Sequence, residues 1–173
     1  MRTRGRGAPP ARRAGAARIS AAGVASLAAI LAVLVFVSLP RLRSLAQQEN
    51  EADAHGTLEL FRGALPVLAA ERPTTALPPS IEELAESDTI AHGLSDGEFL
   101  DHGRVLRRHG YLFRVVDGGV LAWPWKHAAT GRSAFLLTPA GQILQHANVP
   151  RLWDGPDVAT TQVVDVAGWA PLP

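Results

Sequence analysis

The first pattern along the chain is an apolar run from Ile19 to Leu39 that contains no charged residue. As a helix rising 1.5 Å per residue, this run extends about 30 Å, which is the hydrocarbon thickness of a bilayer. Core helices of globular proteins are rarely apolar on every side over such a length. The pattern therefore predicts a transmembrane helix over residues 19–39, with the lipid bilayer as its partner.

Charge on the two sides of this run predicts its orientation. Residues 1–18 contain six arginines and no acid, whereas only Arg41 and Arg43 follow the run closely. Because the more basic flank stays inside, we expect a basic cytoplasmic arm over 1–18 and a single-pass protein of the cytoplasmic membrane with its C-terminal domain outside. No aromatic residue is interleaved with the arginines for base stacking, so we expect no nucleic-acid partner. The six arginines are Arg2, Arg4, Arg6, Arg12, Arg13 and Arg18.

A signal peptide is the alternative interpretation of the same segment. Its apolar stretch is longer than the usual 7–15 residues, and Arg41 and Arg43 follow it directly, which disfavours cleavage. Ser44-Leu45-Ala46 nevertheless offers a small-residue cleavage site. A periplasmic ligand- or partner-binding module, released by cleavage after Ala46 and using a Trp-rich sheet face, therefore remains open.

Helical spacing continues beyond the membrane segment. Apolar residues recur at intervals of three and four, with polar residues between them, which predicts a stalk helix over 40–72 with one face packed on a domain. Pro40 is expected to kink the helix at the membrane exit, and Pro66 to bend or end it. The apolar stripe consists of Ala54, Leu58, Phe61, Leu65 and Leu68.

Residues 73–149 are predicted to form an α+β domain. After a proline-rich linker, Ser80 and Glu83 have the spacing of a capping box, which predicts a short helix through about Glu86. Residues 87–109 are expected to be a loop, because Gly93, Gly97 and Gly103 interrupt a mostly polar segment.

Period-two alternation then predicts four antiparallel strands, the first of them half-buried, because alternate residues of a strand point to opposite faces. Asp117-Gly118-Gly119 is a strong turn signal between the first two. A sheet of this size needs the stalk helix as a second layer. The tail 150–173 is expected to be irregular, with Trp153 and Trp169 as anchors. The predicted strands are Tyr111–Val116, Val120–Trp123, Ala134–Thr138 and Gln142–His146.

Several local segments, in this order, resemble the type IV pilins and the pseudopilins of type II secretion. The resemblance covers about residues 20–147 and implies a non-enzymatic structural or interaction role in a secretion or pilus-like assembly, with protein partners of that assembly. The segments are Leu77-Pro78-Pro79-Ser80-Ile81-Glu82-Glu83-Leu84, His109-Gly110-Tyr111-Leu112-Phe113-Arg114-Val115, Ala122-Trp123-Pro124, Thr130-Gly131-Arg132-Ser133-Ala134-Phe135 and Gly141-Gln142-Ile143.

One feature of those families is missing from this chain. Prepilins carry Gly followed by Phe and an apolar run with Glu at the fifth mature position, whereas Gly15 is followed by Ala16 and the run 19–39 contains no acid. The combination predicts a pilin-like domain on an ordinary, uncleaved anchor.

Few residues of the chain have the type and spacing of a metal site or a cofactor site. The chain has no cysteine, which excludes disulfides, thiol catalysis and iron–sulfur clusters. Its histidines lack the spacing of a zinc site, although His102 and His109 share a segment with Asp96, Glu98 and Asp101. The loop 126–133 has no carboxylate for calcium. We therefore expect no metal and no cofactor. The six histidines are His55, His92, His102, His109, His127 and His146.

Enzymatic sites are not indicated either. Ser95 or Ser133 could serve as a nucleophile, but no Gly-x-Ser-x-Gly elbow is present. We therefore expect no catalytic residue and no enzyme activity. The segment Arg104–Arg108 is expected to be a solvated basic surface that could meet an acidic partner. Aromatic residues of the strands are more typical of core than of a ligand platform; they are Tyr111, Phe113, Trp123 and Trp125.

Overall fold

A computed structural model describes residues 21–71, 77–86, 88–156 and 167–172. The chain divides into two compact units, Met1–Leu39 and Pro40–Pro173. The predicted basic arm, 1–18, lies outside the described residues, as does most of the proline-rich linker.

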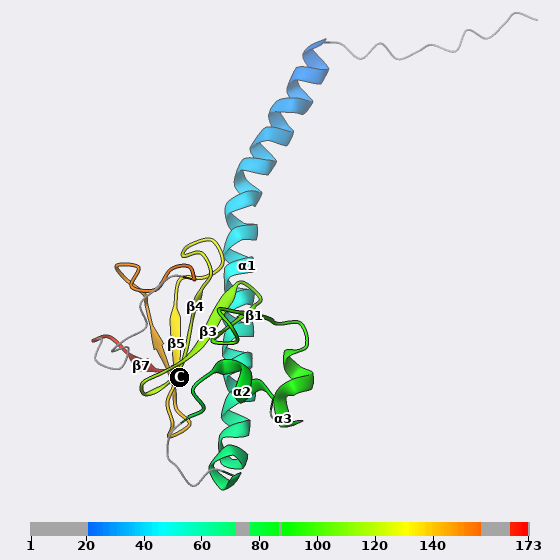
Figure 1. Cartoon of the computed structure of the whole chain (residues 1–173). Helices are drawn as coiled ribbons and strands as arrows, with labels where there is room; N and C mark the ends of the chain where they lie inside the picture. The colour runs from blue at the N-terminus through cyan, green and yellow to red at the C-terminus, as the bar shows by residue number, and fades with distance from the viewer. Residues whose placement is uncertain (1–20, 72–76, 87, 157–166, 173) are drawn as a thin grey trace, which may run out of the picture. The chain divides into compact units, whose positions relative to one another are not determined.

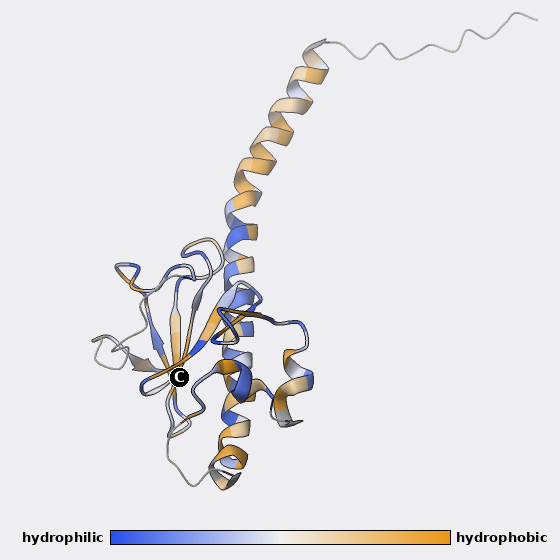
Figure 2. Ribbon diagram, viewed as in Figure 1, coloured by the Kyte–Doolittle hydropathy of each residue, from blue (hydrophilic) through white to orange (hydrophobic). Residues whose placement is uncertain are grey.

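Helix α1 covers Ala21–Glu71 and contains both Pro40 and Pro66. Of the two expectations for Pro66, that it bends the helix or ends it, the second is wrong, since the helix continues through it to Glu71. A proline removes one backbone donor, and the surrounding turns retain their own hydrogen bonds. In the first unit, the described side chains from residue 22 onward are all exposed, and Figure 2 shows them to be predominantly hydrophobic. Among the described residues, α1 alone is long and apolar enough to span a membrane.

The second unit contains a seven-stranded sheet in which every strand pairs antiparallel with its neighbour in the sequence (Figure 1). The fold class is therefore confirmed as α+β, with a long helix packed on an antiparallel meander. The four predicted strands correspond to β3, β4, β5 and β6. The strands are β1 (Glu98–Leu100), β2 (Val105–Arg108), β3 (Tyr111–Val116), β4 (Gly119–Pro124), β5 (Ala134–Leu137), β6 (Ile143–His146) and β7 (Ala170–Pro171).

The loop predicted over 87–109 is wrong. This segment contains α3 (Asp88–Ala91), a 3-10 helix (His92–Leu94) and strands β1 and β2. Leu106 of β2 is fully buried and lies opposite Phe113 of β3, so burial across the pair outweighs the neighbouring glycines. The tail 150–173 was expected to be irregular, but it contributes β7, which pairs with β6.

The central part of the sheet is buried on both faces, which corrects the half-buried prediction for residues 111–113 of the strand 111–116. Tyr111 and Phe113 join α1 in one cluster, the helix-side core, whereas Leu112 belongs to a second cluster, the outer core. Strand β4 alternates in the same way and is buried at every position. The helix-side core includes Ala54, Leu58, Phe61, Ala64, Tyr111, Phe113, Val120, Ala122, Phe135 and Leu137. The outer core consists of Val105, Leu112, Leu121, Trp123, Ala134, Leu136 and Trp153.

The stalk prediction is confirmed in its apolar stripe. Leu58 and Phe61 are fully buried, and Leu65 and Leu68 pack against the same cluster. The short helix α2, Ile81–Ala85, begins where predicted, because the Ser80 hydroxyl oxygen accepts a hydrogen bond from the backbone N–H of Glu83 at 3.1 Å. Thus the elements that carry the candidate site, helix α1 and the hairpin β2–β3, are fixed by burial on the helix-side core.

Candidate functional site

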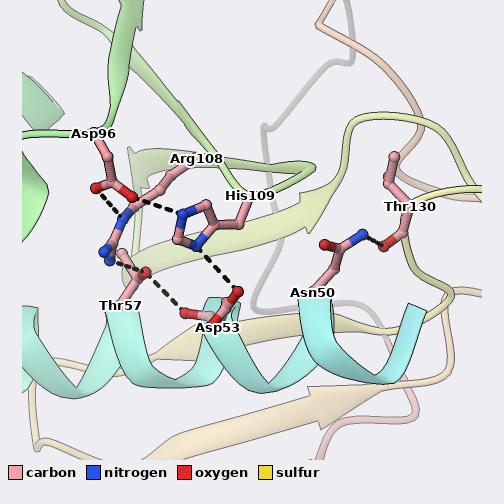
Figure 3. Close-up of polar contacts among 7 residues, drawn as sticks. All are labelled: Asn50, Asp53, Thr57, Asp96, Arg108, His109 and Thr130. Carbon is pink, nitrogen blue, oxygen red and sulfur yellow. Dashed lines mark hydrogen bonds and ion pairs between the residues drawn. The ribbon is translucent and has the colours of Figure 1, made fainter. Parts of the chain in front are cut away.

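Polar side chains of α1 border its buried stripe and contact two turns of the sheet. We call this set of contacts the polar seam, and it has two parts. The loop-binding group is Gln47, Asn50 and Glu51. The His109 cluster is Asp53, Thr57, Asp96, Arg108 and His109, and Figure 3 shows it together with the contact between Asn50 and Thr130. All of these residues belong to the second unit.

The loop-binding group satisfies the backbone of the loop between β4 and β5. Gln47 donates to the carbonyl of Ala128 at 2.5 Å, and Asn50 donates to that of Thr130 at 2.8 Å. One carboxylate oxygen of Glu51 accepts from the backbone N–H groups of two consecutive residues, Arg132 at 2.8 Å and Ser133 at 3.1 Å. Charge-assisted hydrogen bonds of this kind are stronger than neutral ones, so Glu51 is the main fixing point of the loop.

Tyr111 lies beneath this loop. Its hydroxyl donates to the carbonyl of Ser133 at 3.0 Å, and burial, together with the nearby charge of Glu51, raises the pKa of Tyr111 above its ordinary value. Gly131 is required here, because a Cβ at that position would overlap the tyrosine hydroxyl oxygen. The loop thus closes over a neutral, hydrogen-bonded phenol.

In the His109 cluster, an imidazole lies between two carboxylates. His109 Nδ1 is 3.1 Å from Asp53 Oδ2 of α1, and His109 Nε2 is 2.6 Å from Asp96 Oδ2. His109 and Gly110 form the two-residue turn between β2 and β3, both with positive φ. This is the backbone of a type I′ hairpin turn, so the hairpin itself aims the ring at α1.

Arg108 completes the cluster. Its Nε donates to Asp96 at 2.7 Å, and its Nη1 donates to Thr57 Oγ1 at 2.8 Å. The hydrogen bond from Arg108 lowers the pKa of Asp96 below its ordinary value. Only 16% of the Arg108 side chain is exposed, so the expectation of a fully solvated basic surface over 104–108 is wrong at this residue. The physical reason is that the Asp96 carboxylate and the Thr57 hydroxyl accept the hydrogen bonds that the Arg108 guanidinium would otherwise donate to water.

The contacts of the cluster join separate segments of the domain. Two carboxylates face one guanidinium and one imidazole, and both imidazole nitrogens can donate only when the ring is protonated. The hydroxyl of Thr57 donates to the backbone carbonyl of Asp53 at 2.8 Å and accepts from Arg108. The arrangement ties α1, the turn at Asp96 and the β2–β3 hairpin together.

The structure separates most of the histidines considered as metal ligands. His55 pairs with Glu59 along α1 at 3.6 Å, and His92 and His102 are exposed. His146 is buried beside Trp153 and Trp169, with ring centroids 5.2 and 5.3 Å away. Among the residues that the structure describes, no three His, Asp or Glu side chains form a group suited to a metal ion.

The acidic residues near His109 in the sequence also contact different partners. Asp96 joins the cluster, whereas Glu98 pairs with Arg107 at 3.2 Å and Asp101 lies 3.9 Å from Arg114. Of the two serines, Ser133 accepts a hydrogen bond from Gln145 at 2.9 Å, and Ser95 is exposed. The structure therefore brings together only His109 and Asp96 from the residues considered for metal or catalytic sites.

Three of the four strand aromatics, Tyr111, Phe113 and Trp123, are buried in the core, as predicted. Trp123 is fully buried, and its indole N–H donates to the carbonyl of Gly155 at 2.8 Å. Trp153 is 3% exposed. The binding platform that the released-module hypothesis would use is therefore not open on this face. Trp125 is partly exposed, with the Arg107 guanidinium 4.5 Å from its ring centroid.

The loop-binding group was missed by sequence reasoning. Its residues follow helical spacing beside the apolar stripe, which is the signal that could have found them. Their partners are backbone atoms about 80 residues away in the sequence, and backbone atoms have no residue-type signature.

Comparison with family models, with curated proteins and with solved structures gave no match to this chain. The pilin-like character of the protein accordingly rests on its architecture, a long N-terminal apolar helix followed by an antiparallel sheet.

Proposed function

We propose that this protein is a non-enzymatic, single-pass membrane protein that holds a pilin-like domain outside the cytoplasmic membrane. There it serves as a structural or interaction component of a secretion or pilus-like assembly. The observation that carries the proposal is the composition of α1: its first part is apolar and exposed on every side, and its later part packs one face on the sheet.

The contacts of the domain support a structural role. Several polar side chains that could have performed chemistry are engaged with one another or with backbone groups, as in the pairing of His109 with Asp53 and Asp96. Glu51 is committed to the loop backbone in the same way. A domain of this kind binds its partners through its surface and needs no catalytic group.

Reporter fusions at Pro173 test the orientation in the full chain. A periplasmic phosphatase fused there should be active, and a fluorescent protein that folds only in the cytoplasm should be dark. The reverse result would overturn the proposal. Alkaline carbonate extraction of the same cells should leave the protein in the membrane pellet.

The released module is an outcome of a second measurement, N-terminal sequencing of the mature protein. Cleavage after Ala46 would give a chain beginning at Gln47, which is the first residue of the loop-binding group. An intact N-terminus supports the anchored form. Assembly is tested by shearing cells and looking for the protein in filaments, or by crosslinking it to components of a secretion system.

A further inference from the structure

The segment between β6 and β7 carries an exposed apolar tip, which we define as residues 149–152. Val149 is 70% exposed and Leu152 is 40% exposed. Among the described residues outside α1, Val149 has the largest exposed fraction of any large apolar side chain. A single exposed apolar residue needs no explanation, but two on one short turn form a small patch.

The tip is held firmly by the residues on either side of it. The buried Asn148 donates from its amide to the carbonyl of Trp153 at 2.7 Å and accepts from the N–H of Trp153 at 2.9 Å. The backbone N–H of Asn148 donates to His146 at 2.8 Å. Because this clamp is anchored in the outer core, the exposure of Val149 belongs to an ordered turn.

Contacts place the tip at the end of the domain from which the chain runs toward the apolar segment. The N–H of His127 donates to Asp154 at 2.7 Å, two residues beyond the tip, and Ala128 accepts from Gln47 of α1. Figure 1 shows the loop after β4 and the segment after β6 at the same end of the sheet. Gln47 lies about 10 Å along the helix from Pro40.

A bilayer of about 30 Å of hydrocarbon measures about 40–45 Å with its polar regions, so each headgroup layer is about 5–7 Å thick and Gln47 lies just beyond it. Among the described residues, this end of the domain carries exposed basic side chains and two exposed acids, Glu49 and Asp154. Basic residues around an apolar patch suit an anionic lipid surface. The basic residues are Arg41, Arg43, Lys126, Arg132 and Arg151.

We propose that the tip inserts Val149 and Leu152 into the headgroup region of the bilayer in which the protein's own helix is anchored. The tip is thus a second membrane contact, which holds the domain against the lipid surface. This inference rests on the proposed membrane anchor.

Because the chain contains no cysteine, single-cysteine variants of the full chain can be labelled cleanly. Val149→Cys, Ala140→Cys and Leu31→Cys are labelled with an environment-sensitive fluorophore and reconstituted in vesicles of phosphatidylcholine and phosphatidylglycerol. Quenching is measured with phospholipids that carry a nitroxide near the headgroup or in the acyl chain. Ala140 is the matched control, because it is exposed in the turn between β5 and β6. Thermal unfolding of each variant checks the fold.

We expect the label at residue 149 to be quenched about twofold more by headgroup nitroxides than the label at residue 140, as for a side chain held at the interface. The label at residue 31 should be quenched by acyl-chain nitroxides. If residue 31 is quenched and residue 149 behaves like residue 140, the anchor stands and the tip proposal is overturned. Self-quenching at residue 149 without lipid quenching would assign the tip to a second copy and overturn it too. If residue 31 is not quenched, the anchor fails and the tip proposal fails with it.

Discussion

The two parts of helix α1 meet different surroundings although they belong to one element. From residue 22 to residue 46 every described side chain is exposed, and from Gln47 onward buried, partly buried and exposed positions alternate with helical spacing. The first part contains no charged residue before Arg41, whereas the second carries both the apolar stripe and the polar seam. The distribution of side chains around the helix therefore distinguishes an apolar part that is exposed on every side from a part that packs on the domain.

The largest expected effect on the free energy of unfolding comes from replacing a phenylalanine by alanine, and this substitution can be made in both parts of α1. Phe61→Ala should lower the free energy of unfolding of the domain by about 3–5 kcal/mol, because a fully buried ring in contact with Phe113 is replaced by a cavity. Phe36→Ala is the matched control, since Phe36 is 81% exposed on the same helix. Chemical unfolding of the full chain in detergent measures both. Equal losses from the two variants would contradict the division of α1.

An arginine introduced into the apolar part of α1 tests whether this part spans a membrane. Leu31→Arg should make membrane insertion less favourable by about 3 kcal/mol, because the residue lies near the middle of the apolar segment. Leu45→Arg should leave insertion nearly unchanged, since Leu45 lies beyond Pro40. A glycosylation-based insertion assay measures the difference, and similar values for both variants would count against a span ending near Leu39.

The polar seam gives a third contrast. Glu51→Ala should lower the free energy of unfolding by about 2 kcal/mol, because two backbone N–H groups lose a charged acceptor. Glu49→Ala should change it by less than about 0.5 kcal/mol, as for an exposed residue away from such contacts. Hydrogen exchange at Arg132 and Ser133 should also become faster in the first variant only. Unchanged exchange at these amides would refute the role given to Glu51.

The smallest effect is a dependence on acid. Because the hydrogen bond from Arg108 lowers the pKa of Asp96 from its ordinary value of 3.8, the contribution of Asp96 is present above about pH 4 and is lost as the pH falls through the lowered pKa. Asp96→Asn should remove this part of the acid dependence, at a cost of about 0.5 kcal/mol at neutral pH, because the Asp96 side chain is 44% exposed and solvent screens the pair. Asp117→Asn, in an exposed turn, is the control. Identical acid profiles for the Asp96 variant and the parent would contradict the contact.

The sequence predicts those parts of the fold whose signal is local. The apolar stripe of α1, the Ser80 cap and the strands β3 to β6 are readable from periodicity and turn residues. Strands β1 and β2 are not, because Glu98–Leu100 has only three residues and Val105–Arg108 ends in two arginines. Their pairing is decided by partners on the adjacent strand, which local pattern does not contain.

The burial of the central strands on both faces could not be predicted from the local sequence pattern either. The second cover comes from Trp153, whose position depends on the Asn148 clamp and on contacts with His146 and Trp169. In the seam, His109 and Asp96 could be named as neighbours in sequence, but Asp53 could not, since it approaches from α1. Contacts between distant segments are what the sequence alone left undetermined.

The order of the strands has a consequence for biosynthesis. Since each strand pairs with the one made just before it, from β1 to β7, the sheet can grow in step with the emerging polypeptide, and such sequence-local pairing favours rapid folding. The stripe around Leu58 and Phe61 is made first, yet Phe135 and Leu137, which share its cluster, emerge some 75 residues later. Until then this apolar stripe lacks part of its cover, and exposed apolar surface of this kind promotes aggregation during folding.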